Sequence, residues 1–140
     1  MYSLERKIAF MFSSTPLVGE DFLMEGMAPN VPPPTTRLYF QDPTIQQGYQ
    51  TTVRRGTKWS KLEQYQPLVL CETSGSFLSL ATASFSVVFD GIYDIPEFLV
   101  EMNHSLAARS YADLSVALDR AYGSDWPSWT GGWTVLVFHV

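Results

Sequence analysis

The sequence predicts an α+β fold, with a small β-barrel of about five to six strands and two or three flanking helices. Three observations favour this fold. Several short segments have strand composition and are separated by turn residues, one segment carries both end signals of an amphipathic helix, and the chain is long enough for one domain with a core. Its 140 residues are 46% hydrophobic and 16% charged, which excludes a wholly disordered protein.

The strand segments are rich in β-branched and aromatic residues. They are residues 37–40, 51–54, 68–72, 77–89 and 133–140. In the long fourth segment, apolar residues alternate with Thr82, Ser84 and Ser86, so we expect a half-buried strand with a single apolar face. The residues expected on that face are Ala81, Ala83, Phe85, Val87 and Phe89.

The clearest helix signal covers residues 110–122. Ser110 and Asp113 form a pair similar to a capping box, and Gly123 stands where a helix commonly terminates. An apolar stripe along this segment is expected to pack on the sheet. It consists of Tyr111, Leu114, Leu118 and Tyr122.

Two shorter helices are also expected. Asp94 and Pro96 open a helix from about Ile95 to Met102. Asp42-Pro43 places a capping residue before a proline and favours a helix of one or two turns through Gln46 or Gln47.

Residues 1–36 differ from the rest of the chain. They hold four of the five methionines, five of the nine prolines and the run Pro32–Pro34. We interpret them as an N-terminal extension docked on the barrel through its apolar segments, with a free tail as the alternative, and residues 37–140 as the domain proper.

The single cysteine, Cys71, has no intramolecular partner, which is typical of a protein from a reducing compartment. No signal peptide or membrane span is evident, so we expect a cytoplasmic protein without a membrane partner. Two histidines and one cysteine give no recognisable metal-ligand spacing, and no metal or cofactor is predicted.

The charge is unevenly distributed. The chain carries a formal net charge of −5, yet residues 37–61 hold a single acid, Asp42, among several cations. These cations are Arg37, Arg54, Arg55, Lys58 and Lys61. We therefore predict one basic site on an acidic body that repels polyanions elsewhere.

A threonine stands two residues before an arginine in Thr52-Val53-Arg54, and further pieces follow it in a fixed order. The pieces, in chain order, are Gly48–Gly56, His104, the helix at 110–122 and the closing strand at 134–138. In this arrangement residues 37–140 resemble the ASCH domain family of the PUA-like superfamily. The resemblance implies a small PUA-like barrel whose cleft, between the Thr-x-Arg strand and the later helices, binds RNA or modified nucleosides.

A branch of ASCH-like amidohydrolases removes the acetyl group of N4-acetylcytidine with a lysine, a threonine and a glutamate. Only Thr52 matches that pattern. Tyr49 stands at the lysine position, and Ala107 or Ala108 at the glutamate position. If the chain is an enzyme, Tyr49, Thr52 and His104 are the residues available for nucleophilic or proton-transfer work.

Neighbouring strand residues point to opposite faces, so Arg54 and Arg55 cannot share one pocket. The resemblance assigns Arg54 to the cleft, on the same face as Thr52, although Arg54 can equally pair with one of the acids. Lys58, Trp59 and Lys61 interleave an indole with two cations, a combination that favours single-stranded nucleic acid or, alternatively, a solvated surface.

Trp126, Trp129 and Trp133 form an aromatic loop before the last strand. This loop is either a stacking or protein-binding surface, through which a homodimer can form, or a cover folded over the end of the barrel.

The leading hypothesis is therefore an ASCH-type domain that binds single-stranded RNA or a modified nucleoside. The alternatives are a metal-independent ribonuclease or modified-base amidohydrolase on the same cleft, and a protein-interaction module. If all five cations of residues 37–61 met phosphates, the salt slope of RNA binding would be about −3.5.

Overall fold

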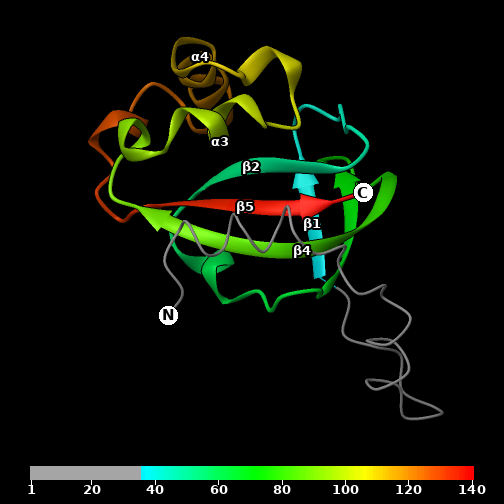
Figure 1. Cartoon of the computed structure of the whole chain (residues 1–140). Coiled ribbons are helices and arrows are strands. Elements are labelled where there is room, and N and C mark those ends of the chain that lie inside the picture. The colour runs from blue at the N-terminus through cyan, green and yellow to red at the C-terminus, as the bar shows by residue number, and fades with distance from the viewer. Residues whose placement is uncertain (1–35) are drawn as a thin grey trace, which may run out of the picture.

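A computed structural model describes residues 36–140, which contain one curled, five-stranded sheet and two α-helices on its outer side (Figure 1). The strands are β1 (Thr36–Phe40), β2 (Tyr49–Arg55), β3 (Pro67–Glu72), β4 (Phe77–Phe89) and β5 (Trp133–His139). The helices are α3 (Glu97–Glu101) and α4 (Tyr111–Tyr122), with 3-10 turns η1 (Lys58–Lys61), η2 (Ile92–Asp94), η3 (Leu106–Ala108) and η4 (Trp126–Ser128). The α+β prediction is confirmed, while the docked extension lies outside the described residues except for Thr36.

The sheet order is β1-β3-β4-β5-β2, so β1 and β2 are its two edges. All pairs are antiparallel except β1 with β3, which is parallel. The sheet curls into a half-barrel whose two edges approach each other. The Arg54 side chain on β2 reaches the Tyr39 carbonyl on β1, which shows how close the edges are. The barrel therefore has an open seam between β1 and β2.

A β-bulge interrupts β4 at Ser84. Ala83 pairs with Phe138, but the next paired residue, Phe85, pairs with Val137, so the alternation of faces reverses there. The expectation of one apolar face along β4 is wrong for this reason. The inner face takes Ala81 and Ala83, whereas Phe85 and Phe89 pack on the outer core.

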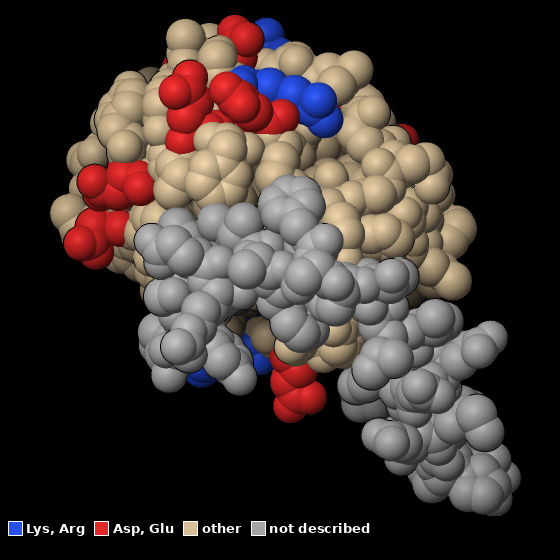
Figure 2. All heavy atoms as spheres, viewed as in Figure 1, with Lys and Arg blue, Asp and Glu red and all other residues tan. Residues whose placement is uncertain are grey.

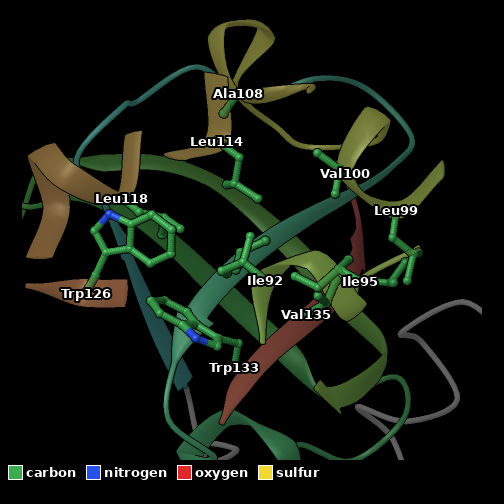
Figure 3. Close-up of a cluster of buried hydrophobic side chains, with 12 residues drawn as sticks. Ile92, Ile95, Leu99, Val100, Ala108, Leu114, Leu118, Trp126, Trp133 and Val135 are labelled. Carbon is green, nitrogen blue, oxygen red and sulfur yellow. The ribbon is translucent and has the colours of Figure 1, made fainter. Parts of the chain in front are cut away.

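Two apolar cores result from this arrangement. The inner core fills the half-barrel and consists of Leu38, Phe40, Leu68, Leu70, Ala81, Ala83, Leu136 and Phe138. The outer core lies between the sheet and the helices (Figure 3) and consists of Val53, Ile92, Ile95, Leu99, Val100, Ala108, Leu114, Leu118, Trp126, Trp133, Val135 and Val137. Together the cores fix the position of α4 relative to the edge strand β2.

The signals at both ends of α4 act as predicted. The Ser110 side chain accepts a hydrogen bond from the Asp113 amide at 3.1 Å, and Gly123 adopts a φ of 80° after the last turn. Within the predicted apolar stripe, Leu114 and Leu118 are buried. The expected helix at 95–102 is shorter than predicted, spanning only Glu97–Glu101. Within residues 36–140, no helix is both long and apolar enough to cross a bilayer.

The helix predicted after Asp42 is absent, and residues 41–48 form an irregular loop. Side chains satisfy the backbone of this loop in place of a helical turn. The Asp42 carboxylate accepts from the Thr44 amide at 3.0 Å. The Gln50 side chain accepts from the Gln46 amide at 2.8 Å and donates to the Gln46 carbonyl at 2.7 Å. Such local side-chain bonds compete with helix formation.

Candidate functional site

A cleft of about 480 Å³ opens at the seam between β1 and β2, with α4 forming its far wall. Its lining comes from the end of β1 and the following loop (39–42), from β2 (52–54), from residues 103–108 and from one face of α4. The space exists partly because the facing residues are small. These are Ala107, Ala108, Ala117 and Ala121.

Arg54 lies in the wall of this cleft and bridges the two edge strands. Its Nε donates to Thr52 Oγ at 3.1 Å and its Nη1 to the Tyr39 carbonyl at 2.7 Å. The guanidinium also lies 4.7 Å from the centre of the Phe40 ring. All of these partners are neutral, so in the described chain Arg54 is not paired with an acid.

Burial sets the electrostatics of Arg54. Loss of water lowers the pKa of Arg54 from its ordinary value, although arginine remains protonated in proteins. Its Nη2 atom has no hydrogen-bond partner among residues 36–140. Every fully buried polar side-chain atom of these residues does have a hydrogen-bond partner, so an atom without one cannot be fully buried. Nη2 therefore retains accessible surface, and the cleft presents a positive charge with no acid paired to it.

The acid in the cleft lining, Asp42, is already engaged. Ser105 Oγ donates to one of its oxygens and the Thr44 amide to the other. Partial burial opposes the carboxylate form, but these hydrogen bonds prevail and lower the pKa of Asp42 below 3.8. Arg120 on α4 also lines the cleft, so its charged lining residues are two cations and one anion.

His104 is held rigidly at the cleft. Its Nδ1 lies 2.8 Å from the Thr44 carbonyl, and its ring meets Phe40 edge to face at 4.7 Å. Burial is the main cause that lowers the pKa of His104 from 6.5, and the nearby charges of Arg54 and Arg109 add to it. The imidazole is therefore neutral near pH 7.

The structure brings together three of the residues predicted for the site, namely Thr52, Arg54 and His104. Tyr49 is not among them, because it occupies the opposite face of β2 from Thr52. There its ring packs edge to face on His139 at 4.6 Å, and burial raises the pKa of Tyr49. The hydroxyl at the lysine position of the amidohydrolase pattern thus lies outside the cleft lining.

The other cations of residues 37–61 do not converge on the cleft. Arg55 lies over the rings of Tyr122 and Trp129, at 4.6 and 5.1 Å. Lys58 lies 4.9 Å from the ring of its neighbour Trp59 on η1, which packs against β4 and β5. Lys61 and Arg37 are exposed outside the lining. A single basic site made of all five cations is therefore not present, and only Arg54 lines the cleft.

The expected aromatic loop is mostly part of the core. Trp126 and Trp133 are 8% and 2% exposed, and their rings meet edge to face at 5.9 Å (Figure 3). Trp129 is 39% exposed, and its Nε1 donates to the Gly132 carbonyl at 2.8 Å. A protein partner or a homodimer at this loop stays a prediction that would depend on Trp129.

Sequence reasoning missed Arg120, Asn103 and Ser105 as lining residues. Arg120 lies on the same face of α4 as Ala117 and Ala121. The sequence pattern that could have predicted its place in the cleft was a helix face with small residues next to a cation. Asn103 and Ser105 flank His104, and the Asn103 side-chain oxygen accepts from the Ser105 amide at 3.0 Å. Short polar residues on both sides of a histidine indicated a loop that is ordered by its own side-chain hydrogen bonds.

The cleft differs from the amidohydrolase pattern in the groups around Thr52. Thr52 Oγ accepts from Arg54, and both Ala107 and Ala108, at the glutamate position, are lining residues without a carboxylate. The described lining contains no lysine. It therefore provides Thr52 with no lysine base.

Charge is unevenly distributed over the surface. On the face shown in Figure 2, acidic side chains gather over the helical side of the molecule and few basic side chains are visible. The whole chain carries a net charge of −5, so a polyanion is repelled by the body and attracted only where cations are concentrated.

Comparison with known proteins identifies the fold. No family model and no curated protein match the sequence. A crystal structure of an ASCH domain from Lactobacillus crispatus JV V101 matches with a TM-score of 0.52 and 13% identity, over 97% of this chain and 94% of that one. The protein therefore has the α+β fold of an ASCH domain, as the resemblance of residues 37–140 predicted.

Proposed function

We propose that the cleft binds one nucleotide unit of single-stranded RNA, or a free modified nucleotide, with a phosphate on Arg54. The observation that supports this proposal is the guanidinium of Arg54. It lies in the cleft wall with neutral partners and an accessible Nη2 atom. A cation without a paired acid in a partly dry site favours an anionic ligand.

The size of the cleft agrees with this ligand. A volume of about 480 Å³ lies in the usual range for small-molecule sites. It suits one nucleotide and excludes a duplex, which would need a broad basic surface. The other cations of residues 37–61 do not provide that surface, since they lie apart from Arg54.

A stacking position for a base lies at the rim. Tyr39 is 43% exposed and lines the cleft next to the carbonyl that Arg54 binds. A base stacked on an aromatic ring contributes about 1–3 kcal/mol without reading sequence. Phosphate on Arg54 and a base on Tyr39 together explain how an acidic protein can hold RNA locally.

Fluorescence anisotropy with a labelled single-stranded RNA tests the proposal. We expect Arg54→Gln to weaken binding by about 10-fold or more, because a charge-assisted hydrogen bond contributes about 1.5–3 kcal/mol. Lys58→Gln removes the same charge outside the cleft and should stay within about twofold. Equal affinity of wild type and Arg54→Gln would contradict the proposal.

Two controls separate binding from other effects. Arg54 bridges β1 and β2, so thermal unfolding of Arg54→Gln and Arg54→Lys must show that both variants are folded. Arg54→Lys keeps the charge without the planar fork and should bind with intermediate affinity. Each endpoint is run on a gel, where intact RNA is expected and cleavage products would indicate a hydrolase instead.

A further inference from the structure

His104 presents an uncharged hydrogen-bond acceptor to the cleft. Its Nδ1 lies 2.8 Å from the Thr44 carbonyl, and a carbonyl oxygen can only accept, so Nδ1 carries the proton. In a neutral imidazole the other nitrogen, Nε2, is then a bare acceptor. The tautomer of His104 is thus fixed by the backbone of the loop that follows β1.

The Nε2 atom has no hydrogen-bond partner within residues 36–140. His104 is 8% exposed and lines the cleft. Because the described side chains contain no polar atom that is both fully buried and unpartnered, Nε2 keeps some accessible surface there. A nine-tenths-buried side chain therefore presents a free acceptor to the cleft.

The ring cannot easily turn away from this position. Its backbone amide donates to the Thr51 carbonyl at 2.9 Å, and its carbonyl accepts from the Gln46 side chain at 3.2 Å. The Phe40 ring packs edge to face with it, at 4.7 Å between ring centres. Such a preorganised acceptor is suited to selecting among ligands.

Three other polar groups of the lining are donors. They are Nη2 of Arg54, the amide nitrogen of Asn103, whose oxygen is already engaged, and the hydroxyl proton of Thr52, whose oxygen accepts from Arg54. The Asp42 oxygens both accept from protein groups. Nε2 of His104 is thus a buried, fixed acceptor beside these donors, and a ligand matches it with a donor of its own.

We propose that His104 is a specificity-determining residue, which reads an N–H or O–H donor of the bound nucleotide through Nε2. This inference rests on the proposed function of the cleft. The donor is either an exocyclic amino group of the base or the ribose 2′-hydroxyl, since a phosphate offers only acceptors. A nucleotide with an oxo group facing Nε2 places two acceptors together and is rejected.

Competition against the labelled RNA tests this inference. The competitors are CMP, UMP, which replaces the 4-amino group by an oxo group, and deoxy-CMP, which lacks the 2′-hydroxyl. We expect wild type to prefer CMP roughly 10-fold over one of the other two. Preference over UMP identifies the amino group as the donor, and preference over deoxy-CMP identifies the hydroxyl.

Two variants separate the acceptor from a merely structural role. His104→Asn keeps an amide N–H near the position of Nδ1 for the Thr44 carbonyl but lacks Nε2, so it should fold and lose the preference. His104→Gln places an amide oxygen near the position of Nε2 and should restore part of the preference. A preference unchanged in His104→Asn would overturn the inference.

The pH profile of the CMP preference is a second readout. Burial is the main cause that lowers the pKa of His104 below its ordinary value of 6.5, so the imidazole stays neutral at pH 6.5. Asp42, Arg54 and Arg109 are the charged groups that also act on it. The preference should therefore hold at pH 6.5 and persist below it, and it should be lost only where the imidazole protonates and Nε2 becomes a donor. Loss of the preference already above pH 6.5 would contradict the inference.

The outcomes also separate this inference from the proposed function. Binding that depends on Arg54 but shows no preference among the nucleotides overturns the role of His104 alone. Failure of every nucleotide to compete, together with an Arg54→Gln variant that binds RNA normally, overturns the proposed function and this inference with it.

Discussion

Arg54 and Arg55 are adjacent in the sequence and lie in opposite environments. Arg54 is in the cleft, with the neutral partners Thr52 and Tyr39 and an accessible Nη2. Arg55 lies on the other face of β2, over the rings of Tyr122 and Trp129 at 4.6 and 5.1 Å. One arginine has a free donor facing a cavity, and the other covers aromatic surface.

The difference shows that the surroundings of a cation decide whether it can bind a ligand, and that the number of nearby cations in the sequence does not. The alternation of side chains along β2 decides which arginine enters the cleft. The cations of η1 are close to Arg54 in sequence, yet η1 packs at β4 and β5.

The largest effect is expected in the core behind Arg55. Trp133 is 2% exposed and meets the rings of Tyr122 and Trp126. Trp133→Ala should reduce the free energy of unfolding by about 3–5 kcal/mol, measured by urea denaturation. A loss below about 1 kcal/mol would contradict the assignment of this tryptophan to the core.

The salt dependence of RNA binding should reveal how few phosphates the cleft contacts. Arg54 and Arg120 line it, so we expect a slope of about −1.4, from about −0.7 per contact on a single strand, instead of −3.5. The slope of Arg54→Gln should be smaller in magnitude by about 0.7, and that of Lys58→Gln unchanged. A steep slope lost with Lys58 and Lys61 would move the site to η1.

Asp42 should stabilise the cleft at neutral pH. Its hydrogen bonds from Ser105 and Thr44 hold its pKa below 3.8, so this stability is present above pH 3.8 and lost as pH falls through the lowered pKa. Asp42→Asn should therefore reduce the free energy of unfolding by about 1 kcal/mol at pH 7. Thermal melts against pH should show the two proteins converging in acid, and a difference that grows in acid would refute this role.

The smallest effect is expected at Arg55. Its cation–π contacts contribute about 0.5–1 kcal/mol at a partly exposed site, so Arg55→Ala should lower stability by that amount. RNA affinity should stay within about twofold of wild type. If Arg55→Ala abolished binding while Arg54→Gln did not, the two arginines would have been assigned to the wrong roles.

Local signals predicted much of the fold. The five strand segments and α4 follow from composition, from the Ser110 cap and from the glycine at 123. The bulge at Ser84 could not be predicted, because it depends on how β4 pairs with β5 across many intervening residues. The loop after Asp42 was mistaken for a helix because Asp42 and Gln50 side chains replace helical hydrogen bonds there.

The candidate site was predictable only in part. Thr52 and Arg54 are two residues apart on β2, so the alternation of side chains places them on the same face. The resemblance implies that His104 lies near them. The distance in space from Lys58 to the cleft, and the approach of Arg120 from α4, depend on tertiary packing that no local pattern records. Counting cations along the sequence therefore overestimated the basic site.

The most direct test of the account is an NMR spectrum of the arginine Nε–Hε groups during titration with a nucleoside monophosphate. Spectra of Arg54→Gln and Arg55→Ala assign the two resonances. We expect the Arg54 resonance to shift in a saturable manner while the Arg55 resonance stays in place. Movement of Arg55 alone, or of neither resonance, would contradict the claim that Arg54 is the anion-binding group of the cleft.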